Sequence, residues 1–344
     1  MDVIDKNVDF SYLLNLIMDD FEYEDLVLMG APKNLLDDPV YKQSDDILKQ
    51  NFDNALKGGM VGSFWEQSKN NNTFRHIAVN RVFDGKNHLR LYLSPKDEYL
   101  YLIVNEMLKR SFRNNIPIYL KYSRENRYDK IVVFIHNKTD LALITKLLEE
   151  IKNDHPEWFD NMKKSPIWLS ESKFKGAYIT PEKCTKKDIN NDFSSYTKAF
   201  ETMMNNVRSE VLFCFRINDR KKLKNINRNE LLKVFSYYFK REIGKMGLFF
   251  YYDENNNLVA YTNSLFPGFG KSVDEAIRLT DEGLEIGKRI DASNKRYYKI
   301  PFGNAIPNSS EEFKKFPFYD LDDVTYYNML FYPHLYGNDS PGSR

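Results

Sequence analysis

The sequence lacks most of the features that mark secreted, membrane-bound or zinc-stabilised proteins. It has only two cysteines in 344 residues, which excludes a disulfide framework and a four-cysteine zinc site. It has no apolar run near the roughly 20 residues that a membrane-spanning helix needs. Its first residues, MDVIDKNVDFSYLL, do not show the basic-then-apolar order of a signal peptide. These absences predict a soluble, cytoplasmic protein without a membrane partner.

The sequence also has little net charge and few of the common site motifs. Its 50 basic and 49 acidic side chains give a net charge of +1, so no overall field favours nucleic acid. The five histidines are scattered, and neither HExxH nor GxSxG occurs. Gly270, Lys271 and Ser272 suggest a phosphate-binding loop, but Leu265 replaces its first glycine. The sequence therefore shows no metal-binding motif and predicts neither a nucleotide-binding loop nor a nucleic-acid partner.

Hydrophobic patterning divides the chain into successive regions. Residues 1–75 are acidic and show helical spacing, whereas residues 76–205 follow the order β-α-β-β-α. The first strand of this module alternates, with Leu89, Leu91 and Leu93 on one face. The other expected elements are a helix that begins at Ser94-Pro95, strands at 116–122 and 130–136, and a helix from about Asp140.

The same order of elements is predicted a second time after residue 205. The expected elements are a strand VLFCFRIN (211–218), a helix at 228–244, two strands within 247–262 and a helix at 273–290. The chain is therefore predicted to be an α+β protein with mixed or antiparallel sheets. Its expected parts are a helical N-terminal region (1–75), an α/β domain (76–205), a second α/β domain (206–335) and a disordered tail (336–344).

The strand IPIYLKY carries a lysine in an otherwise apolar setting. In strict alternation, Lys121 lies on the face opposite Leu120, and a neighbouring strand at 88–94 would add Arg90 to the same face. The following turn supplies Arg124 and Arg127. Arginine binds phosphate oxygens through two hydrogen bonds, and a partly buried lysine beside other cations can act as a base. Two interpretations stay open here: a phosphate-binding pocket, or an ordinary solvent-exposed basic face.

The stretch from residue 90 to residue 140 resembles the HopA-type effector family, whose members also occur as lyases in peptide-modification pathways. The likeness covers about residues 75–205. Further downstream Tyr196 and Thr197 stand where the family has phenylalanine and glycine. The likeness rests on three short motifs: an R-x-Y-L strand (Arg90, Tyr92, Leu93), an IP-x-x-x-K strand (Ile116, Pro117, Lys121) and an R-Y-D turn (Arg127, Tyr128, Asp129).

The resemblance implies a phosphothreonine-lyase-like domain at 76–205. Such a carbon–oxygen lyase removes phosphate by β-elimination from phosphoserine or phosphothreonine and leaves a dehydroamino acid. It requires no metal or organic cofactor. Its expected partners are a phosphorylated peptide or protein and a kinase-like protein that prepares this substrate. The implied roles are a base (Lys121), phosphate clamps (Arg127, Arg90 and Arg124) and an acid (Tyr128 or His88).

Two other functions are compatible with the same sequence. The domain could keep the fold without the chemistry and serve as a scaffold that binds a peptide or partner protein. The 23 tyrosines and 25 phenylalanines favour this alternative, because aromatic side chains supply contact area at low entropic cost. The other alternative is a secreted effector that acts on a host phosphoprotein by the same lyase chemistry.

Overall fold

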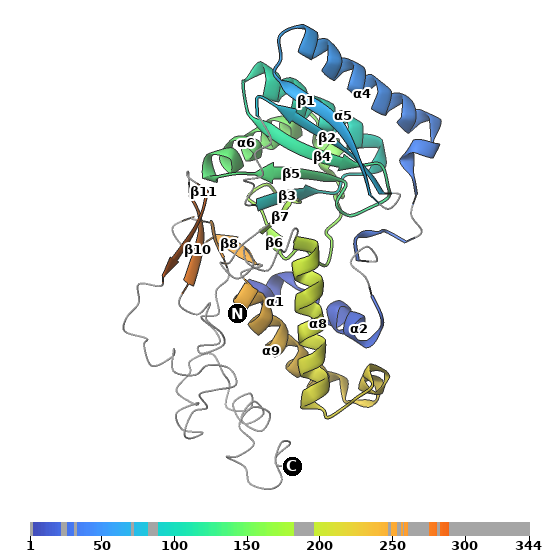
Figure 1. Ribbon diagram of the computed structural model, residues 1–344, viewed down its shortest axis with the longest axis vertical. Helices are drawn as coiled ribbons and strands as arrows, with labels where there is room; N and C mark the ends of the chain where they lie inside the picture. The colour runs from blue at the N-terminus through green and yellow to red at the C-terminus, as the bar shows by residue number, and fades with distance from the viewer. Residues whose placement is uncertain are drawn as a thin grey trace.

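The structure is a computed structural model, and its described part contains a large sheet with helices, a helical body and a smaller second sheet. A large sheet with three helices lies at the top of Figure 1, and a group of helices lies below it. None of the helices within the described part is long and apolar enough to cross a membrane. The described residues are 3–21, 26–30, 33–69, 72–81, 89–181, 196–246, 249–252, 256, 258–260, 275–280 and 283–288.

The main sheet has seven antiparallel strands in the order β1-β2-β4-β5-β3-β7-β6. Their bounds are β1 (Gly62–Lys69), β2 (Asn72–Val79), β3 (Leu89–Leu93), β4 (Ile118–Ser123), β5 (Ile131–Ile135), β6 (Ser170–Glu171) and β7 (Tyr178–Pro181). β5 lies between β3 and β4, so the expected direct pairing of these two strands is wrong. Their alternation is as expected, because Leu89, Leu91 and Leu120 are all buried on one face.

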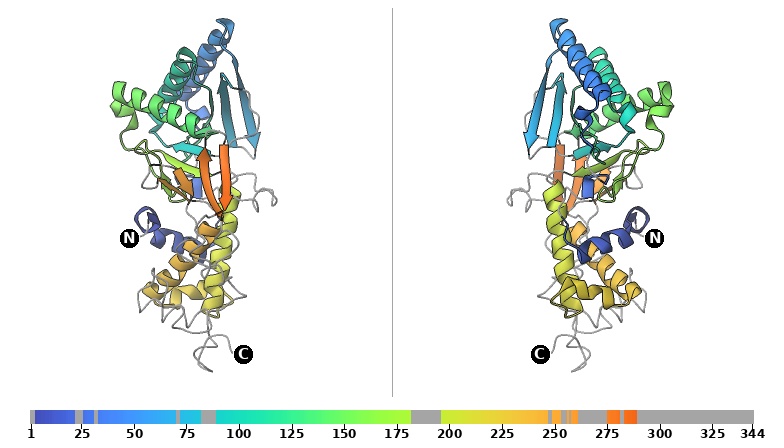
Figure 2. Two further views of the ribbon diagram at one scale, coloured as in Figure 1. Left: turned by 90° about the vertical axis from the view of Figure 1, so that its left-hand side faces the viewer. Right: turned by 90° about the vertical axis from the view of Figure 1, so that its right-hand side faces the viewer.

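Three helices cover that apolar face: α4 (Pro39–Lys57), α5 (Asp97–Arg113) and α6 (Lys138–Asp154). Figure 2 shows them on one side of the sheet. The side chain of Asp38 caps α4 by accepting a hydrogen bond from the backbone of Val40, and Asn137 caps α6 in the same way. The order β3-α5-β4-β5-α6 is the β-α-β-β-α module that the patterning predicted. The fold class, α+β with an antiparallel sheet, is therefore confirmed.

The opposite face of the sheet adjoins the helical body. This body contains α1 (Val3–Asn7), α2 (Phe10–Met18), α8 (Tyr196–Cys214) and α9 (Arg228–Met246), and short 3-10 helices occur at η1 (Leu35–Asp37), η2 (Pro156–Phe159) and η3 (Arg220–Asn225). One hydrophobic cluster joins Tyr119 and Phe134 of the sheet to Phe200 of α8 and Phe235 of α9. The N-terminal end of α8 points towards the sheet (Figure 1).

The predicted second module is not present in this form. Residues 211–214, expected in a strand, form the last turn of α8. They continue an i, i+4 series of buried side chains, Met203, Val207 and Val211, which packs in the helical body. The helix expected at 273–290 is instead a hairpin of β10 (Glu275–Thr280) and β11 (Gly283–Lys288).

The hairpin belongs to a second sheet in the order β11-β10-β9-β8, with β8 at Phe250–Tyr252 and β9 at Leu258–Ala260. Its sequence alternates with period two at Ile277, Leu279, Leu284 and Ile286, which favours strands over a capped helix. Elements also cross the predicted domain limits. β1 and β2 extend the main sheet into the region expected to be helical, and α8 spans residue 205. The tail at 336–344 lies outside the described residues.

Candidate functional site

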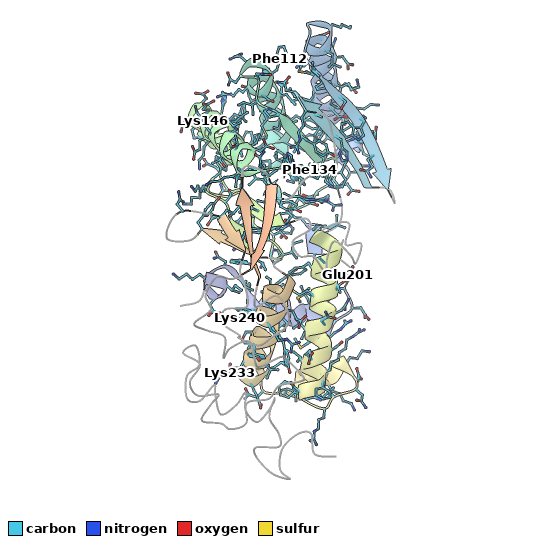
Figure 3. The ribbon with its side chains drawn as sticks, turned by 60° about the vertical axis from the view of Figure 1, so that its left-hand side comes forward. Phe112, Phe134, Lys146, Glu201, Lys233 and Lys240 are labelled. Carbon is cyan, nitrogen blue, oxygen red and sulfur yellow. The ribbon has the colours of Figure 1, made fainter. Side chains whose placement is uncertain are left out.

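The sheet face opposite α5 and α6 carries a continuous stack of rings that ends at an arginine. Five neighbouring strands contribute one side chain each: Trp65, His76, Tyr119, Phe134 and Arg90. The ring centroids are 5.2 Å apart for Trp65–His76, 5.9 Å for His76–Tyr119 and 4.2 Å for Tyr119–Phe134. The guanidinium carbon of Arg90 lies 5.2 Å from the centroid of Phe134. Figure 3 shows Phe134 on the side of the sheet that faces α8.

Lys121 lies within this face, where its Cα pairs with that of His76 across β4 and β2. Burial of the imidazole and the positive charges of Lys121 and Arg90 lower the pKa of His76 to about 4. The two cations therefore act on one ring that is neutral at pH 7. Lys121 and Arg90 therefore share one face of the sheet, as the alternation predicted, with β5 between their two strands.

Only one ring nitrogen of His76 has a hydrogen-bond partner among the described residues. Its Nδ1 lies 2.8 Å from the hydroxyl oxygen of Tyr119, and the direction of this hydrogen bond depends on the imidazole tautomer. Its Nε2 is buried and has no hydrogen-bond partner among the described residues. A buried polar atom without a partner is costly, so Nε2 is a natural contact for a polar group of a ligand.

Phe74 of β2 joins the arginine–tyrosine turn to this face. The Nζ of Lys121 lies 4.1 Å from the centroid of the Phe74 ring, and the guanidinium carbon of Arg127 lies 5.1 Å from it. Both contacts have cation–π geometry. The ring fixes the lysine on the sheet and places Arg127 close to it.

Arg127 is fully buried, and carboxylates occupy its guanidinium. Its Nε lies 2.6 Å and its Nη2 3.2 Å from the two oxygens of Asp129, and its Nη1 lies 3.3 Å from Glu125. These carboxylates accept hydrogen bonds from the guanidinium N–H groups with which arginine would otherwise bind a phosphate. The turn SRENRYD therefore holds Arg127 in a local ion-pair cluster, beside the site but not open to it.

The other predicted residues differ in their surroundings. Arg124 is buried and reaches Glu66 at 2.9 Å and Asp45 of α4 at 3.9 Å, which places it with α4. Tyr128 donates its backbone N–H to the carbonyl of Val27, and its side chain packs against the hydrophobic cluster that contains Tyr119 and Phe134. His88 lies outside the described residues. The structure thus places Lys121 and Arg90 on one face, with Arg127 beside them through Phe74, whereas Arg124 belongs to the cluster at α4.

A further wall of the face comes from β7 and the segment before β6. Tyr92 of β3 stacks on Trp168 with centroids 4.5 Å apart. Thr180 pairs with Arg90 across β7 and β3. The Oγ1 of Thr180 and the Nε1 of Trp168 are buried, and neither has a hydrogen-bond partner in the described part of the chain. Polar atoms able to donate a hydrogen bond therefore accompany the cations on this face.

Sequence reasoning missed four members of this face: Trp65, Phe74, His76 and Phe134. The signal was present in NTFRHIAV (72–79), where Phe74, His76 and Ala78 alternate with the buried Ile77 and Val79. Assigning residues up to 75 to a helical region hid it.

No protein-family model, curated protein or solved structure matches the chain. The likeness to the HopA-type family therefore rests on its three short motifs, and function has to be argued from the sheet face itself.

Proposed function

We propose that this sheet face binds a phosphorylated serine or threonine of a peptide or protein and eliminates the phosphate. The placement of Arg90, Lys121 and the buried Nε2 of His76 on one face of the sheet supports the proposal most directly. Two cations, a ring nitrogen without a partner and an aromatic floor suit a bound phosphate monoester. A phosphate between the two cations would offset the repulsion that they exert on a protonated imidazole.

In the proposed reaction Lys121 is the base. The Lys121 ammonium first releases its proton to water, and the resulting amine removes the proton from Cα of the phosphorylated residue. The electrons of that bond form a Cα=Cβ double bond. The Cβ–O bond breaks, and its electrons leave with the phosphate. The products are a dehydroamino acid and inorganic phosphate, so no oxidant, water or cofactor is consumed. Arg90 holds the phosphate and neutralises the charge that develops on it.

His76 is the proposed proton donor to the leaving phosphate, in place of His88 and Tyr128. Without substrate, the fields of Lys121 and Arg90 help to keep the imidazole neutral. A phosphate dianion held by Arg90 reverses that field and raises the pKa of His76, so that the ring can carry a proton when it is needed. Arg127 has a positioning role, because its ion pairs with Asp129 and Glu125 fix its place against Phe74.

Mass spectrometry of phosphoserine and phosphothreonine peptides tests the proposal. Loss of phosphoric acid that leaves a thiol-reactive alkene is the expected result. Lys121→Met should slow this loss by about 10²- to 10⁴-fold, the usual contribution of a positioned base. Lys146→Met is the matched control, because Lys146 is exposed on α6, at the covered face of the sheet (Figure 3), and should keep full activity.

Other outcomes separate this function from its competitors. Release of phosphate that restores the hydroxyl would make the protein a phosphatase and overturn the elimination mechanism. A peptide-binding scaffold is the second candidate, and the partly exposed Trp65 at the end of the ring stack favours it. Binding of a phosphopeptide without turnover, even after addition of a kinase-like partner, would support the scaffold.

A further inference from the structure

Exposed apolar side chains gather between α4 and α5, on the side of the sheet away from the proposed lyase site. Seven large apolar side chains of the described residues are exposed, and four of them line this groove. The four are Val40, Ile47, Leu102 and Phe112, with exposed fractions of 67%, 49%, 44% and 42%. Such a concentration on one surface is typical of an interface.

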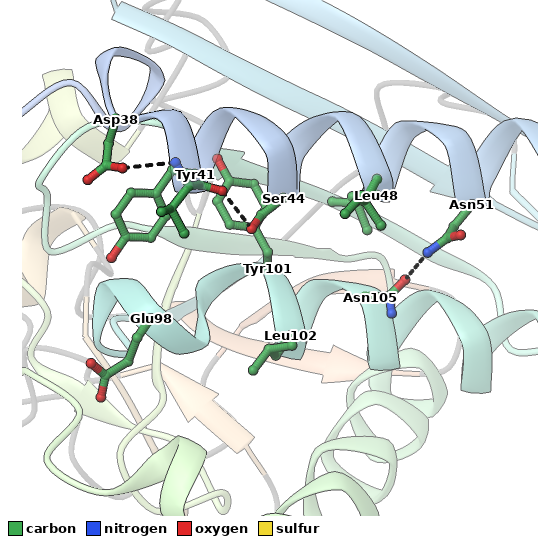
Figure 4. Close-up of a pocket in the computed structure, with 11 residues that line it drawn as sticks. Asp38, Tyr41, Ser44, Leu48, Asn51, Glu98, Tyr101, Leu102 and Asn105 are labelled. Atoms are coloured by element: carbon green, nitrogen blue, oxygen red, sulfur yellow. Dashed lines mark hydrogen bonds between the residues drawn. The ribbon is translucent and has the colours of Figure 1, made fainter.

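The groove consists of two adjoining cavities of about 470 and 340 Å³. Both cavities are lined by Asn51 of α4 and Asn105 of α5, whose side chains meet across the groove at 3.5 Å. Figure 4 shows the first cavity, where the two helices run in the same direction. The groove therefore has two distinct ends, with Asn51 and Asn105 at its middle.

The two ends carry opposite charge. Asp38 and Glu98 line the cavity near the beginnings of the helices, and Lys109 and Arg113 line the cavity near their ends. Asp38 and Glu98 lie on opposite sides of the groove, with Tyr41 beside them, in Figure 4. A surface with this distribution is complementary to itself when a copy is turned end for end. A twofold axis through the middle of the groove places the acidic end of each copy against the basic end of the other.

We propose that this groove is the interface of a symmetric homodimer. The exposed side chains of Ile47 and Leu102 enter the cavity of the second copy, and Glu98 faces Arg113 of that copy. The α5 helix of 17 residues is about 26 Å long, so the contact is at the small end of stable interfaces. A dimer that dissociates on dilution is therefore expected. The proposed lyase face lies on the other side of the sheet, so this dimer does not cover it.

Sedimentation velocity of the whole chain tests the proposal over about 1 to 100 μM. The expected result is a concentration-dependent shift towards twice the mass of one chain. Leu102→Glu should weaken dimerisation by about tenfold or more, because it places a charge in an apolar contact. Phe213→Glu is the matched control: Phe213 of α8 is 74% exposed and lies outside both cavities, so its replacement should leave the dimer unchanged.

Charge exchange tests the end-to-end orientation. Glu98→Lys and Arg113→Glu should each weaken the dimer, and the double variant should restore it, because the two positions face each other across the axis. Asn51→Cys should form a disulfide between copies on oxidation, whereas the wild-type chain should not. A chain that stays monomeric throughout the concentration range, or a dimer that Leu102→Glu and Phe213→Glu weaken equally, would overturn the proposal.

Discussion

The two faces of the seven-stranded sheet are built from alternate residues of the same strands, yet they differ in kind. In β4, Leu120 is fully buried under helices, while its neighbours Tyr119 and Lys121 lie among rings and cations. In β3, Leu91 is likewise buried under the helices, while Arg90 lies over the ring of Phe134 on the opposite face. Period-two alternation thus places a stabilising face and a candidate chemical face within one layer of backbone.

The difference teaches where the stability of the fold resides. Each buried Leu, Ile or Val of the covered face contributes about 1.5–3 kcal/mol, and α5 and α6 each add an apolar stripe. The opposite face also buries Tyr119 and Phe134 against the helical body, but the Nε2 of His76 is buried there without a hydrogen-bond partner among the described residues, which costs free energy. The covered face therefore offsets the cost of groups that the other face holds for binding.

The largest expected effect comes from a buried polar cluster that links the covering helix α4 to the sheet. Asp45 is 3% exposed, accepts a hydrogen bond from the Tyr122 hydroxyl and lies 3.3 Å from Arg75 and 3.9 Å from Arg124. Asp45→Ala should lower the free energy of unfolding by about 3–5 kcal/mol, because buried cations lose a counter-charge. Urea unfolding followed by circular dichroism measures the loss.

The same helix offers the control. Asp53 pairs with Lys49 at 2.8 Å, but its side chain is 43% exposed, so Asp53→Ala should cost about 0.5 kcal/mol or less. Equal losses for Asp45→Ala and Asp53→Ala would mean that burial of the cluster does not set its strength, and that Arg124 serves another purpose.

Much of the covered face could be predicted from the sequence. The apolar stripe of Leu100, Ile103 and Met107 in α5 is buried as its 3.6-residue period indicated, and Leu89 and Leu91 alternate as expected. The alternation also placed Lys121 and Arg90 on a common face. These predictions succeeded because burial follows from the period alone, whichever strands turn out to be neighbours.

The chemical face could be predicted only in part, because its members come from strands that are distant in the sequence. His76 meets Lys121 only through the pairing of β2 with β4, which no local pattern reveals. The sequence suggested that Arg127 could bind a phosphate, yet Asp129, two residues later on the same turn, forms an ion pair with it. Whether a turn carboxylate folds back onto a neighbouring guanidinium depends on backbone geometry that composition does not encode.

The next largest effect is the loss of folding stability at low pH that His76 causes. Because the pKa of His76 falls to about 4 in the folded chain, the unfolded chain binds a proton between pH 6.5 and about 4 while the folded chain does not. Stability that is complete above pH 6.5 is therefore lost as the pH falls through this window, by about 3 kcal/mol at 1.4 kcal/mol per pH unit.

Unfolding at pH 7 and pH 4.5 tests this linkage. His76→Phe keeps the stacking with Trp65 and Tyr119 but has no proton to bind, so its stability should change less between the two pH values than that of the wild type. His155→Phe, at a partly exposed histidine stacked on Trp158 and away from Lys121 and Arg90, should keep the wild-type dependence. If both variants match the wild type, His76 does not carry the acid sensitivity.

The smallest expected effect comes from the N-terminal cap of α6 on the covered face, where local stabilisation of the helix can be compared with its packing on the sheet. The side chain of Asn137 accepts a hydrogen bond from the backbone of Asp140 at 2.8 Å and caps α6. Asn137→Ala should lower the free energy of unfolding by only about 1 kcal/mol, because Ile144, Leu147 and other buried side chains hold the helix to the sheet. Elimination activity should be unchanged, since α6 contacts the face opposite Lys121. A larger loss of stability, or any loss of activity, would show that the two faces are coupled through β5 and not independent.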